Sequence, residues 1–174
     1  MERAIFAGGC FWCTEAYFLR LDGVNSVSPG YIGGNIENPT YEMICTGNTG
    51  HVEAIEINFD SKKISYMNLL EVFFDTHDPT QVDGQGNDIG SQYMSVIFYT
   101  NEKQKKQAAS YIEKIFNSFK DPIVTKIYSE KPFYMAEDYH KNYFNNNMSQ
   151  PYCKIIIEPK YKKFINKYEL LLKK

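Results

Sequence analysis

The sequence predicts an α+β protein in which helices and a sheet form a two-layer sandwich. Segments with the apolar spacing of helices interleave with short strand-like segments, but without the regular alternation of a doubly wound fold. No glycine-rich phosphate loop is present to indicate a nucleotide-binding fold. The 174 residues have the size of one domain and contain no internal repeat or long linker, so we expect a single domain over residues 1–174.

Five short segments have the apolar or alternating pattern of strands. In chain order they are residues 4–7, 54–59, 94–99, 123–128 and 153–157. The second is the clearest, because Ile55, Ile57 and Phe59 alternate with other residues and therefore share one face.

The predicted helices lie between or after these strands. They are residues 11–21, a helix that begins after Ser65, residues 101–119, residues 136–144 and a lysine-rich tail after Pro159. Ser65 is a candidate N-cap, because its hydroxyl can accept a hydrogen bond from the first turn. That helix carries the apolar residues Met67, Leu70, Phe73 and Phe74.

Two long segments are predicted to be loops. Residues 22–39 are rich in glycine, proline and asparagine, and residues 78–93 form a second glycine-containing segment. A loop of 16 residues in a compact domain is typically functional. The expected architecture is a ferredoxin-like mixed sheet with flanking helices and a long C-terminal segment.

The composition is that of an ordinary globular protein and excludes several classes of function. The net charge of −2 provides no basic field for nucleic acid or anionic lipid. No apolar stretch is long enough for a membrane span and no signal peptide is visible, so we expect a cytoplasmic monomer without a membrane partner. Four cysteines in this length do not make a disulfide scaffold, and in a reducing compartment they are typically buried, metal-bound or catalytic.

Cys10 is the candidate nucleophile. It follows Gly8 and Gly9 and opens the first predicted helix, where unpaired backbone N–H groups and the positive end of the helix dipole surround its sulfur. This environment favours the thiolate and lowers the pKa of a thiol from about 8.5. The glycines allow a substrate to approach the backbone closely. The next residues, Phe11 and Trp12, provide two aromatic rings for an apolar pocket.

Glu53 is the candidate acid. It has the same parity as Ile55, Ile57 and Phe59, so its carboxyl group points to the apolar face if the strand extends that far. A buried carboxyl group retains its proton near neutral pH and can then act as a general acid. If the strand begins at Ala54, Glu53 lies in solvent instead.

Four blocks of the sequence resemble the peptide methionine sulfoxide reductase A family. They occur in the family's order and are Gly8-Gly9-Cys10-Phe11-Trp12, Gly50-His51-Val52-Glu53, residues 85–93 and Ala136-Glu137-Asp138-Tyr139-His140. The resemblance extends from Ala4 to about Lys160. It implies an enzyme that reduces methionine-S-sulfoxide, in proteins and as the free amino acid, and so repairs oxidative damage.

The family resemblance also implies residue roles. Cys10 is similar to the cysteine that attacks the sulfoxide sulfur, and Glu53 to the acid that protonates the sulfoxide oxygen. Tyr41 and Tyr93 match two tyrosines that donate hydrogen bonds to that oxygen. The remaining matches are the pocket wall for the substrate methyl group, Phe11 and Trp12, and an acidic residue that organises the site, Asp88. No metal or organic cofactor is implied.

The product of the first step is a sulfenic acid on Cys10, which a second thiol must convert to a disulfide. Cys153 resembles the resolving cysteine of many relatives, and Cys13 that of others. Side chains at i and i+3 of a helix lie about 5–6 Å apart at Cβ, and a disulfide needs about 3.5–4.5 Å, so geometry leaves both alternatives open. A thioredoxin-like dithiol is expected to reduce the disulfide. Cys45 is expected to be structural.

Two other functions compete with this interpretation. A general disulfide oxidoreductase would use the Cys-x-x-Cys pair formed by Cys10 and Cys13. A structural zinc module needs four ligands, typically in two close pairs, and the chain has one such pair. The histidines, His51, His77 and His140, are expected to be hydrogen-bonded structural groups.

Overall fold

A computed structural model describes all 174 residues. One sheet of six strands has the order β7-β6-β1-β3-β2-β8. Its central strands come from two β–α–β units, β1–α1–β2 and β3–α3–β6, which interlock so that every neighbouring pair among them is antiparallel. This is the ferredoxin-like order. The sheet is mixed because β7 pairs in parallel with β6, so the predicted fold class is confirmed.

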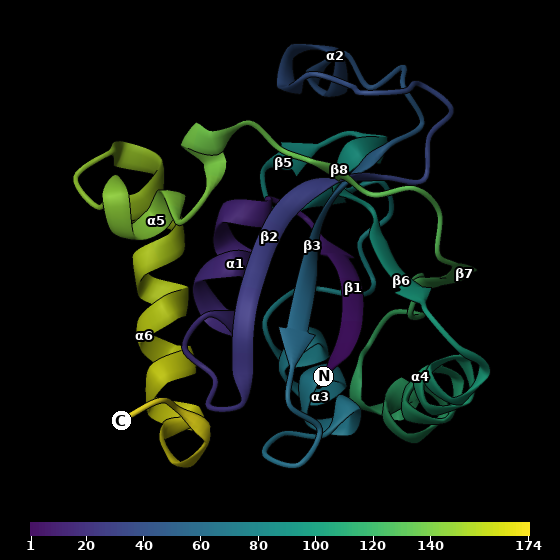
Figure 1. Cartoon of the computed structure of the whole chain (residues 1–174), viewed down its shortest axis with the longest axis vertical. Helices are drawn as coiled ribbons and strands as arrows, with labels where there is room; N and C mark the ends of the chain where they lie inside the picture. The colour runs from purple at the N-terminus through teal and green to yellow at the C-terminus, as the bar shows by residue number, and fades with distance from the viewer.

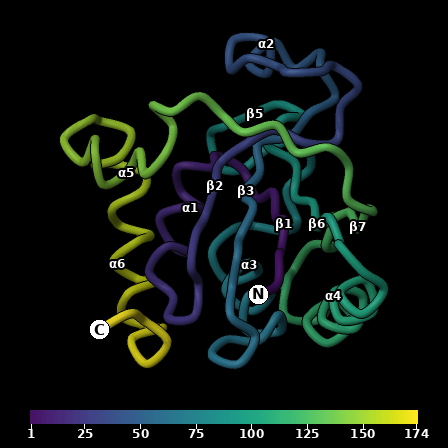
Figure 2. The backbone as a smooth tube through the Cα atoms, viewed as in Figure 1, coloured from purple at the N-terminus to yellow at the C-terminus, as the bar shows by residue number.

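The elements of the two units have these bounds: β1 (Glu2–Gly8), α1 (Phe11–Phe18), β2 (Val24–Ile32), β3 (Val52–Phe59), α3 (Tyr66–Asp75) and β6 (Ser95–Tyr99). The other long elements are α4 (Glu102–Ile115), β7 (Lys126–Ser129), β8 (Tyr134–Met135) and α6 (Glu158–Lys167). Figure 1 shows α1 and α3 behind the sheet, with α6 beside α1 and α4 beyond β6. The tube in Figure 2 shows the C-terminus just beyond the end of α6. No helix has the length and apolar character that crossing a bilayer requires.

The main core lies between the sheet and the helices. It contains 26 buried residues, including Phe6, Ile55 and Ile57 from the strands and Phe18 and Phe73 from the helices. The ring of Phe6 stacks on that of Phe73, with centroids 4.8 Å apart. The alternation predicted for residues 54–59 is therefore correct, and it fixes which face of β3 points toward α1.

The cap predicted for the second helix is also correct. The Ser65 hydroxyl accepts a hydrogen bond from the backbone N–H of Asn68, and the Asn68 side chain accepts one from the backbone N–H of Ser65. This reciprocal pair is a capping box that satisfies two N–H groups at the start of α3. The charged helix of residues 101–119 is shorter than predicted, because α4 ends at Ile115 and a 3₁₀ turn, Phe116–Ser118, follows.

The prediction of a loop over residues 22–39 is wrong, because β2 (Val24–Ile32) occupies its first half. Pro29 and Gly30 resemble turn residues in the sequence, yet both lie within the strand. A Cβ atom on Gly30 would lie 2.4 Å from the ring of Phe133. The glycine therefore serves the close packing of a neighbouring segment against the strand, which sequence patterns do not reveal.

The strand predicted at residues 153–157 is also wrong. The segment is a π-helical turn, Cys153–Ile157, that continues into α6. Its apolar run suggested a strand, but only Cys153 and Ile157 are buried, and Ile155 is 68% exposed. Residues four apart share a face of a helix, so the helical form buries both against α1.

Two further segments differ in detail from the prediction. Residues 136–144 form no continuous helix: a 3₁₀ turn, Asp138–His140, is separated from α5 (Tyr143–Asn146) by Asn142, whose φ is +52°. Residues 78–93 contain a small hairpin of β4 (Gly84–Gln85) and β5 (Asp88–Ile89) and then a 3₁₀ turn, Ser91–Tyr93. Short elements of this kind lack the length that a hydrophobic period needs to be detected.

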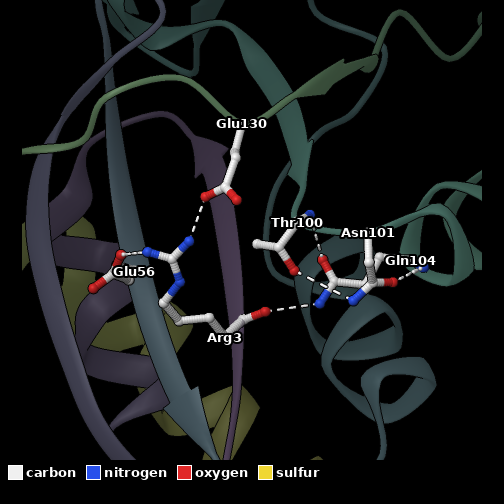
Figure 3. A network of polar contacts seen from close by, with 6 residues as sticks. All are labelled: Arg3, Glu56, Thr100, Asn101, Gln104 and Glu130. Carbon is white, nitrogen blue, oxygen red and sulfur yellow. Dashed lines mark hydrogen bonds and ion pairs between the residues drawn. The ribbon is translucent and has the colours of Figure 1, made fainter.

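A polar network links the central strands β1 and β3 to α4 (Figure 3). The guanidinium of Arg3 pairs with Glu56 at 3.1 Å and also with Glu130. The Gln104 side chain donates to the backbone oxygen of Arg3 at 2.7 Å and accepts from the backbone N–H of Thr100 at 3.0 Å. These contacts join β1, β3 and the start of α4 on the side of the molecule away from Cys10.

Candidate active site

Cys10 lies at the turn between β1 and α1. It is the N-cap residue of α1, and its backbone oxygen accepts hydrogen bonds from the N–H groups of Cys13 and Thr14. Gly9 precedes it with φ +92°, and a Cβ atom there would lie 2.6 Å from the Cβ of Gln85. The glycine thus lets the β4–β5 hairpin, rather than a substrate, approach the backbone beside Cys10.

One face of α1 lines a cavity of about 500 Å³. Cys10, Cys13, Thr14 and Tyr17 are spaced i, i+3, i+4 and i+7, so they lie in one row along the helix. The β4–β5 hairpin and the C-terminal helical segment form the opposite wall, with Gln85, Asn87, Asp88, Tyr152, Ile155 and Lys160 among its residues. The cavity therefore gives access to both thiols of the Cys-x-x-Cys pair.

Glu53 lies on the buried face of β3, as its parity predicts. It is 2% exposed, and its Oε1 accepts a hydrogen bond of 3.2 Å from the backbone N–H of Phe11, the residue after Cys10. Burial raises the pKa of Glu53 to about 8, against the smaller opposing effect of that hydrogen bond. At neutral pH the site therefore contains a protonated carboxyl group next to the backbone of the candidate nucleophile.

The predicted charge state of Cys10 is wrong. Burial raises the pKa of Cys10 well above its ordinary value, and Cys13 and Glu53 raise it further. A backbone hydrogen bond at the helix start acts in the opposite direction but is outweighed. With Cys10 only 9% exposed, the resting residue is a neutral thiol. The desolvation cost of a buried anion exceeds the benefit of a helix N-terminus.

Tyr41 and Tyr93 lie close enough to Glu53 for its charge to affect their pKa values. Tyr41 is the first residue of α2 (Tyr41–Cys45), and Tyr93 is the last of the 3₁₀ turn after β5. Burial raises the pKa of each phenol, and the charge of Glu53 is the next cause in both. Both hydroxyls are therefore neutral donors near the buried acid.

Glu137 holds Tyr41 in place. Its carboxylate accepts a hydrogen bond from the Tyr31 hydroxyl at 3.0 Å and another from the backbone N–H of Tyr41 at 3.0 Å. Burial acts to raise the pKa of Glu137, but these hydrogen bonds outweigh it and lower the pKa. The ionised carboxylate therefore connects Tyr31 of β2 to the start of α2. Tyr31 is also the residue that pairs with Glu53 between β2 and β3.

Asp88 begins β5 and lies on the cavity wall. Its Oδ2 accepts a hydrogen bond of 2.6 Å from the hydroxyl of Tyr152, which precedes the π-helical turn. The charge of Asp88 contributes to the raised pKa of Glu53. Asp88 is thus brought together with Cys10, Cys13 and Glu53, as the sequence blocks imply.

Phe11 and Trp12 belong to an aromatic cluster beside the start of α1. Phe11 is 1% exposed and packs against Tyr31 and His140, with ring centroids 5.7 and 5.0 Å away. The Trp12 ring stacks on Tyr143 at 3.8 Å, and its Nε1–H donates to Nδ1 of His140 at 2.9 Å. Neither ring is among the residues that line the 500 Å³ cavity, although Trp12 contacts Tyr152, which does line it.

The two candidate resolving cysteines have different environments. Cys13 is half-buried and lines the same cavity as Cys10. A side-chain hydrogen bond with Cys10 lowers the pKa of Cys13, and Lys160 and Tyr152 lower it further, although burial opposes them. Cys153 is fully buried behind Cys13, and burial raises its pKa. Cys45 is exposed at the end of α2.

The histidines are hydrogen-bonded within the fold. His51 accepts from the backbone N–H of Gly34 at 3.1 Å, and its other ring nitrogen lies 2.7 Å from the oxygen of Ile36. His77 contacts the Ser95 hydroxyl at 2.7 Å, and burial lowers its pKa to about 4. His140 is fully buried beside Trp12.

Sequence reasoning missed three residues that shape the site: Glu137, His140 and Tyr152. Glu137 and His140 lie within a quoted sequence block, but only the contacts show that they position Tyr41 and Trp12. Tyr152 precedes Cys153, in a segment predicted to be a strand, and it reaches Asp88 only because that segment is helical. Spacing in the sequence could not place a side chain against a residue 64 positions away.

Fold and site together define a cysteine-dependent oxidoreductase with a protonated buried acid beside its nucleophile. A family model described as "Peptide methionine sulfoxide reductase" matches residues 2–171. The protein is similar to peptide methionine sulfoxide reductase MsrA of Sulfolobus acidocaldarius, with 50% identity over 168 residues that cover 97% of this chain and 96% of the relative. MsrA of Acinetobacter baumannii is 50% identical over 173 residues, 99% of each chain.

Solved structures agree with the sequence comparisons. Mxr1 from Saccharomyces cerevisiae in reduced form has a TM-score of 0.81 and 30% identity, over 87% of this chain and 88% of Mxr1. Methionine sulfoxide reductase A of Corynebacterium diphtheriae has a TM-score of 0.76 and 33% identity, over 84% of this chain and 74% of that one. The chain belongs to the peptide methionine sulfoxide reductase family. It is an oxidoreductase that reduces methionine sulfoxide at the expense of thiols.

Proposed function

We propose that Cys10 removes oxygen from the sulfur of a methionine-S-sulfoxide, while Glu53 donates a proton to that oxygen and accepts the thiol proton. The observation that carries this proposal is the neutral carboxyl group of Glu53, bonded at 3.2 Å to the amide next to Cys10. An oxide is a poor leaving group, so the sulfoxide oxygen must gain a proton as the sulfur–sulfur bond forms. Glu53 is buried, protonated at neutral pH and close enough to supply it.

The first step needs only Cys10, Glu53 and the substrate to balance its protons and electrons. Glu53 donates its proton to the sulfoxide oxygen, and the Cys10 sulfur attacks the substrate sulfur while its thiol proton passes to the Glu53 carboxylate. The hydroxyl group then moves to Cys10 and the bond between the two sulfurs breaks. Methionine leaves, its sulfur reduced by two electrons, and Cys10 is oxidised to a sulfenic acid.

We propose the following roles for the other residues. Tyr41 and Tyr93 donate hydrogen bonds to the sulfoxide oxygen as negative charge develops on it. Asp88 holds the β4–β5 hairpin against the C-terminal segment through its hydrogen bond with Tyr152. Phe11 and Trp12, which follow Cys10 directly and pack in one aromatic cluster with His140, form the apolar wall for the S-methyl group.

We assign the resolving role to Cys13. Cys13 lines the same cavity as Cys10, and its interaction with Cys10 is the largest cause of its lowered pKa. Cys153 is fully buried in a helical turn rather than in a mobile loop, so it cannot reach Cys10 without displacing Cys13 or unwinding that turn. Condensation of the sulfenic acid with Cys13 forms a disulfide and releases water.

Replacement of each cysteine by alanine tests this assignment. Cys13→Ala is expected to release one methionine per enzyme and then stop, because the first step needs only Cys10. Its turnover with thioredoxin, thioredoxin reductase and NADPH should fall about 100-fold or more, whereas Cys153→Ala should retain most of its turnover. Chromatography of methionine in single- and multiple-turnover reactions measures both. A normal steady state in Cys13→Ala, together with a stalled Cys153→Ala, would reverse the assignment.

We propose that a thioredoxin-type dithiol reduces the Cys10–Cys13 disulfide. Mxr1, whose reduced form resembles this chain, has a crystal structure in complex with Trx2. One core cluster extends from Ala4 in β1 to Tyr168 after α6, which supports a single domain over residues 1–174, and we propose that it acts as a monomer. The need for Cys13 as a free thiol supports a reducing, cytoplasmic compartment.

A stereochemical assay tests the substrate class. The protein is incubated with each pure epimer of methionine sulfoxide and dithiothreitol, and the released methionine is measured. We expect release from the S epimer at least 100-fold faster than from the R epimer, because donors and apolar wall can fit only one arrangement of oxygen and methyl group around sulfur. Equal rates would argue against a site in which Tyr41, Tyr93 and Glu53 converge on one oxygen.

A further inference from the structure

The hydroxyl of Tyr152 lies between two groups that the second chemical step involves. It donates a hydrogen bond of 2.6 Å to Oδ2 of Asp88, and it lines the same cavity as Cys13. Its ring is fixed edge-on to Trp12, with centroids 5.7 Å apart. Tyr152 comes from the C-terminal segment, Asp88 from the β4–β5 hairpin and Cys13 from α1, so three separate elements meet here.

Tyr152 and Cys13 lie close enough to affect each other's pKa. Tyr152 is among the groups that lower the pKa of Cys13, after Cys10 and Lys160, and burial raises the pKa of Tyr152, with the charges of Cys10 and Cys13 raising it further. The hydroxyl has one proton, and in the resting structure the short bond to Asp88 takes it. The oxygen of Tyr152 is thus placed between a thiol that can donate and a carboxylate that can accept.

Disulfide formation needs such a path. The Cys13 thiol must lose its proton to become nucleophilic, so a base within reach of its sulfur speeds the step. The site contains two carboxyl groups, those of Glu53 and Asp88. Glu53 is already protonated at neutral pH and cannot accept the proton. Asp88 therefore remains as the base, one hydroxyl group away from Cys13.

We propose that Tyr152 relays the thiol proton of Cys13 to Asp88 as Cys13 attacks the Cys10 sulfenic acid. The inference rests on the assignment of Cys13 as the resolving thiol. In this step the Cys13–Cys10 sulfur–sulfur bond forms and the sulfur–oxygen bond of the sulfenic acid breaks. The leaving hydroxyl group takes the proton of Glu53 and departs as water. The thiol proton moves to the Tyr152 oxygen as the phenol proton moves to Asp88, and solvent then restores both carboxyl groups.

Tyr152→Phe tests the relay, because it removes the hydroxyl and keeps the ring against Trp12. Enzyme oxidised with one equivalent of methionine-S-sulfoxide is quenched at intervals, and mass spectrometry follows the dimedone adduct of the sulfenic acid and the Cys10–Cys13 disulfide. We expect disulfide formation at pH 7 to slow about 100-fold and the sulfenic acid to accumulate. The rate should recover about tenfold per pH unit above pH 7, as solvent supplies the thiolate, whereas the wild-type rate changes little.

Two further variants complete the design. Tyr161→Phe, which removes a hydroxyl from α6 where the ring packs on Phe144, is the matched control and should behave as wild type. Asp88→Asn should slow the same step, with the same recovery at high pH and no further effect when combined with Tyr152→Phe. If Tyr152→Phe does not fold, the rate and pH dependence of disulfide formation in Asp88→Asn test the relay instead.

The outcomes separate the relay from the assignment on which it rests. A wild-type rate in Tyr152→Phe, or a slow rate that does not recover with pH, overturns the relay and leaves Tyr152 a packing residue. A wild-type enzyme that forms no Cys10–Cys13 disulfide at all overturns the resolving role of Cys13 instead.

Discussion

Cys10→Ser is expected to release no methionine from methionine sulfoxide while the fold stays intact. A serine oxygen in the place of sulfur is a weak nucleophile at its ordinary pKa. It also cannot accept the substrate oxygen as a sulfenic acid, because oxygen transfer to a hydroxyl would give a peroxide. We therefore expect a loss of at least about 10⁴-fold in the first step, measured as methionine per enzyme in a single-turnover reaction.

The control for this variant is Cys45→Ser, which alters an exposed thiol at the end of α2. It should retain wild-type release, since Cys45 has no part in the oxygen transfer. Circular dichroism and urea unfolding should show both variants folded. Retained release of methionine by Cys10→Ser would mean that another thiol is the nucleophile, and the proposed chemistry would not stand.

Glu53→Gln is expected to lose about 10²–10⁴-fold in the first step, the usual contribution of a positioned general acid. The amide keeps an oxygen that can accept the bond from the Phe11 N–H, so the backbone beside Cys10 stays in place. It cannot donate the proton that the sulfoxide oxygen needs. Rapid-quench measurement of methionine at pH 7 gives the effect. An undiminished rate would show that the proton comes from elsewhere.

The same residue predicts a pH profile. The proton on Glu53 is required, and its pKa is about 8, so the first step should be constant below about pH 7. Above pH 8 the rate should fall about tenfold per unit until other groups take over. Glu53→Gln should lack this titration.

Glu53→Gln should also make the protein more stable. The folded pKa of about 8 exceeds the ordinary value of 4.5, so the folded state binds a proton that the unfolded chain has released. Stability from this group is complete below pH 4.5 and is lost as the pH rises toward 8. The amide avoids that loss, which corresponds to about 3 kcal/mol at pH 7. Urea unfolding at pH 5 and pH 7 should show a larger gain at the higher pH.

This variant separates two functions of the Cys-x-x-Cys pair. A general disulfide oxidoreductase needs two thiols and no buried acid, so Glu53→Gln would preserve its exchange activity. The sulfoxide reductase loses its first step with the same change. Insulin reduction and methionine release are measured on the same preparation, and loss of methionine release upon this substitution identifies the sulfoxide reductase.

The burial of Glu53 could be predicted from sequence because a strand has a strict period of two residues. Ile55, Ile57 and Phe59 fix that face, and the carboxyl group follows. The position of Cys10 at a helix start was equally accessible from the glycines before it. Its charge state was not, since it depends on burial by segments far away in the chain, and burial outweighs the helix terminus.

The errors in the fold have the same origin. Pro29 and Gly30 resemble a turn, but tertiary pairing with β3 and close packing of Phe133 place them in a strand. The run from Cys153 to Ile157 resembles a strand, but burial against α1 selects the helical form. These outcomes depend on contacts between distant segments, and a local pattern does not contain them.

Trp12 is the only tryptophan of the chain, so all indole fluorescence of the protein arises beside the reacting thiols. Its ring is stacked on Tyr143 and hydrogen-bonded to His140, and both partners come from the C-terminal part of the chain. A strained ring closure between Cys10 and Cys13 would shift the first turn of α1 and change the polarity around the indole. The enzyme thus contains its own optical probe, which can follow oxidation and recycling in real time without a label.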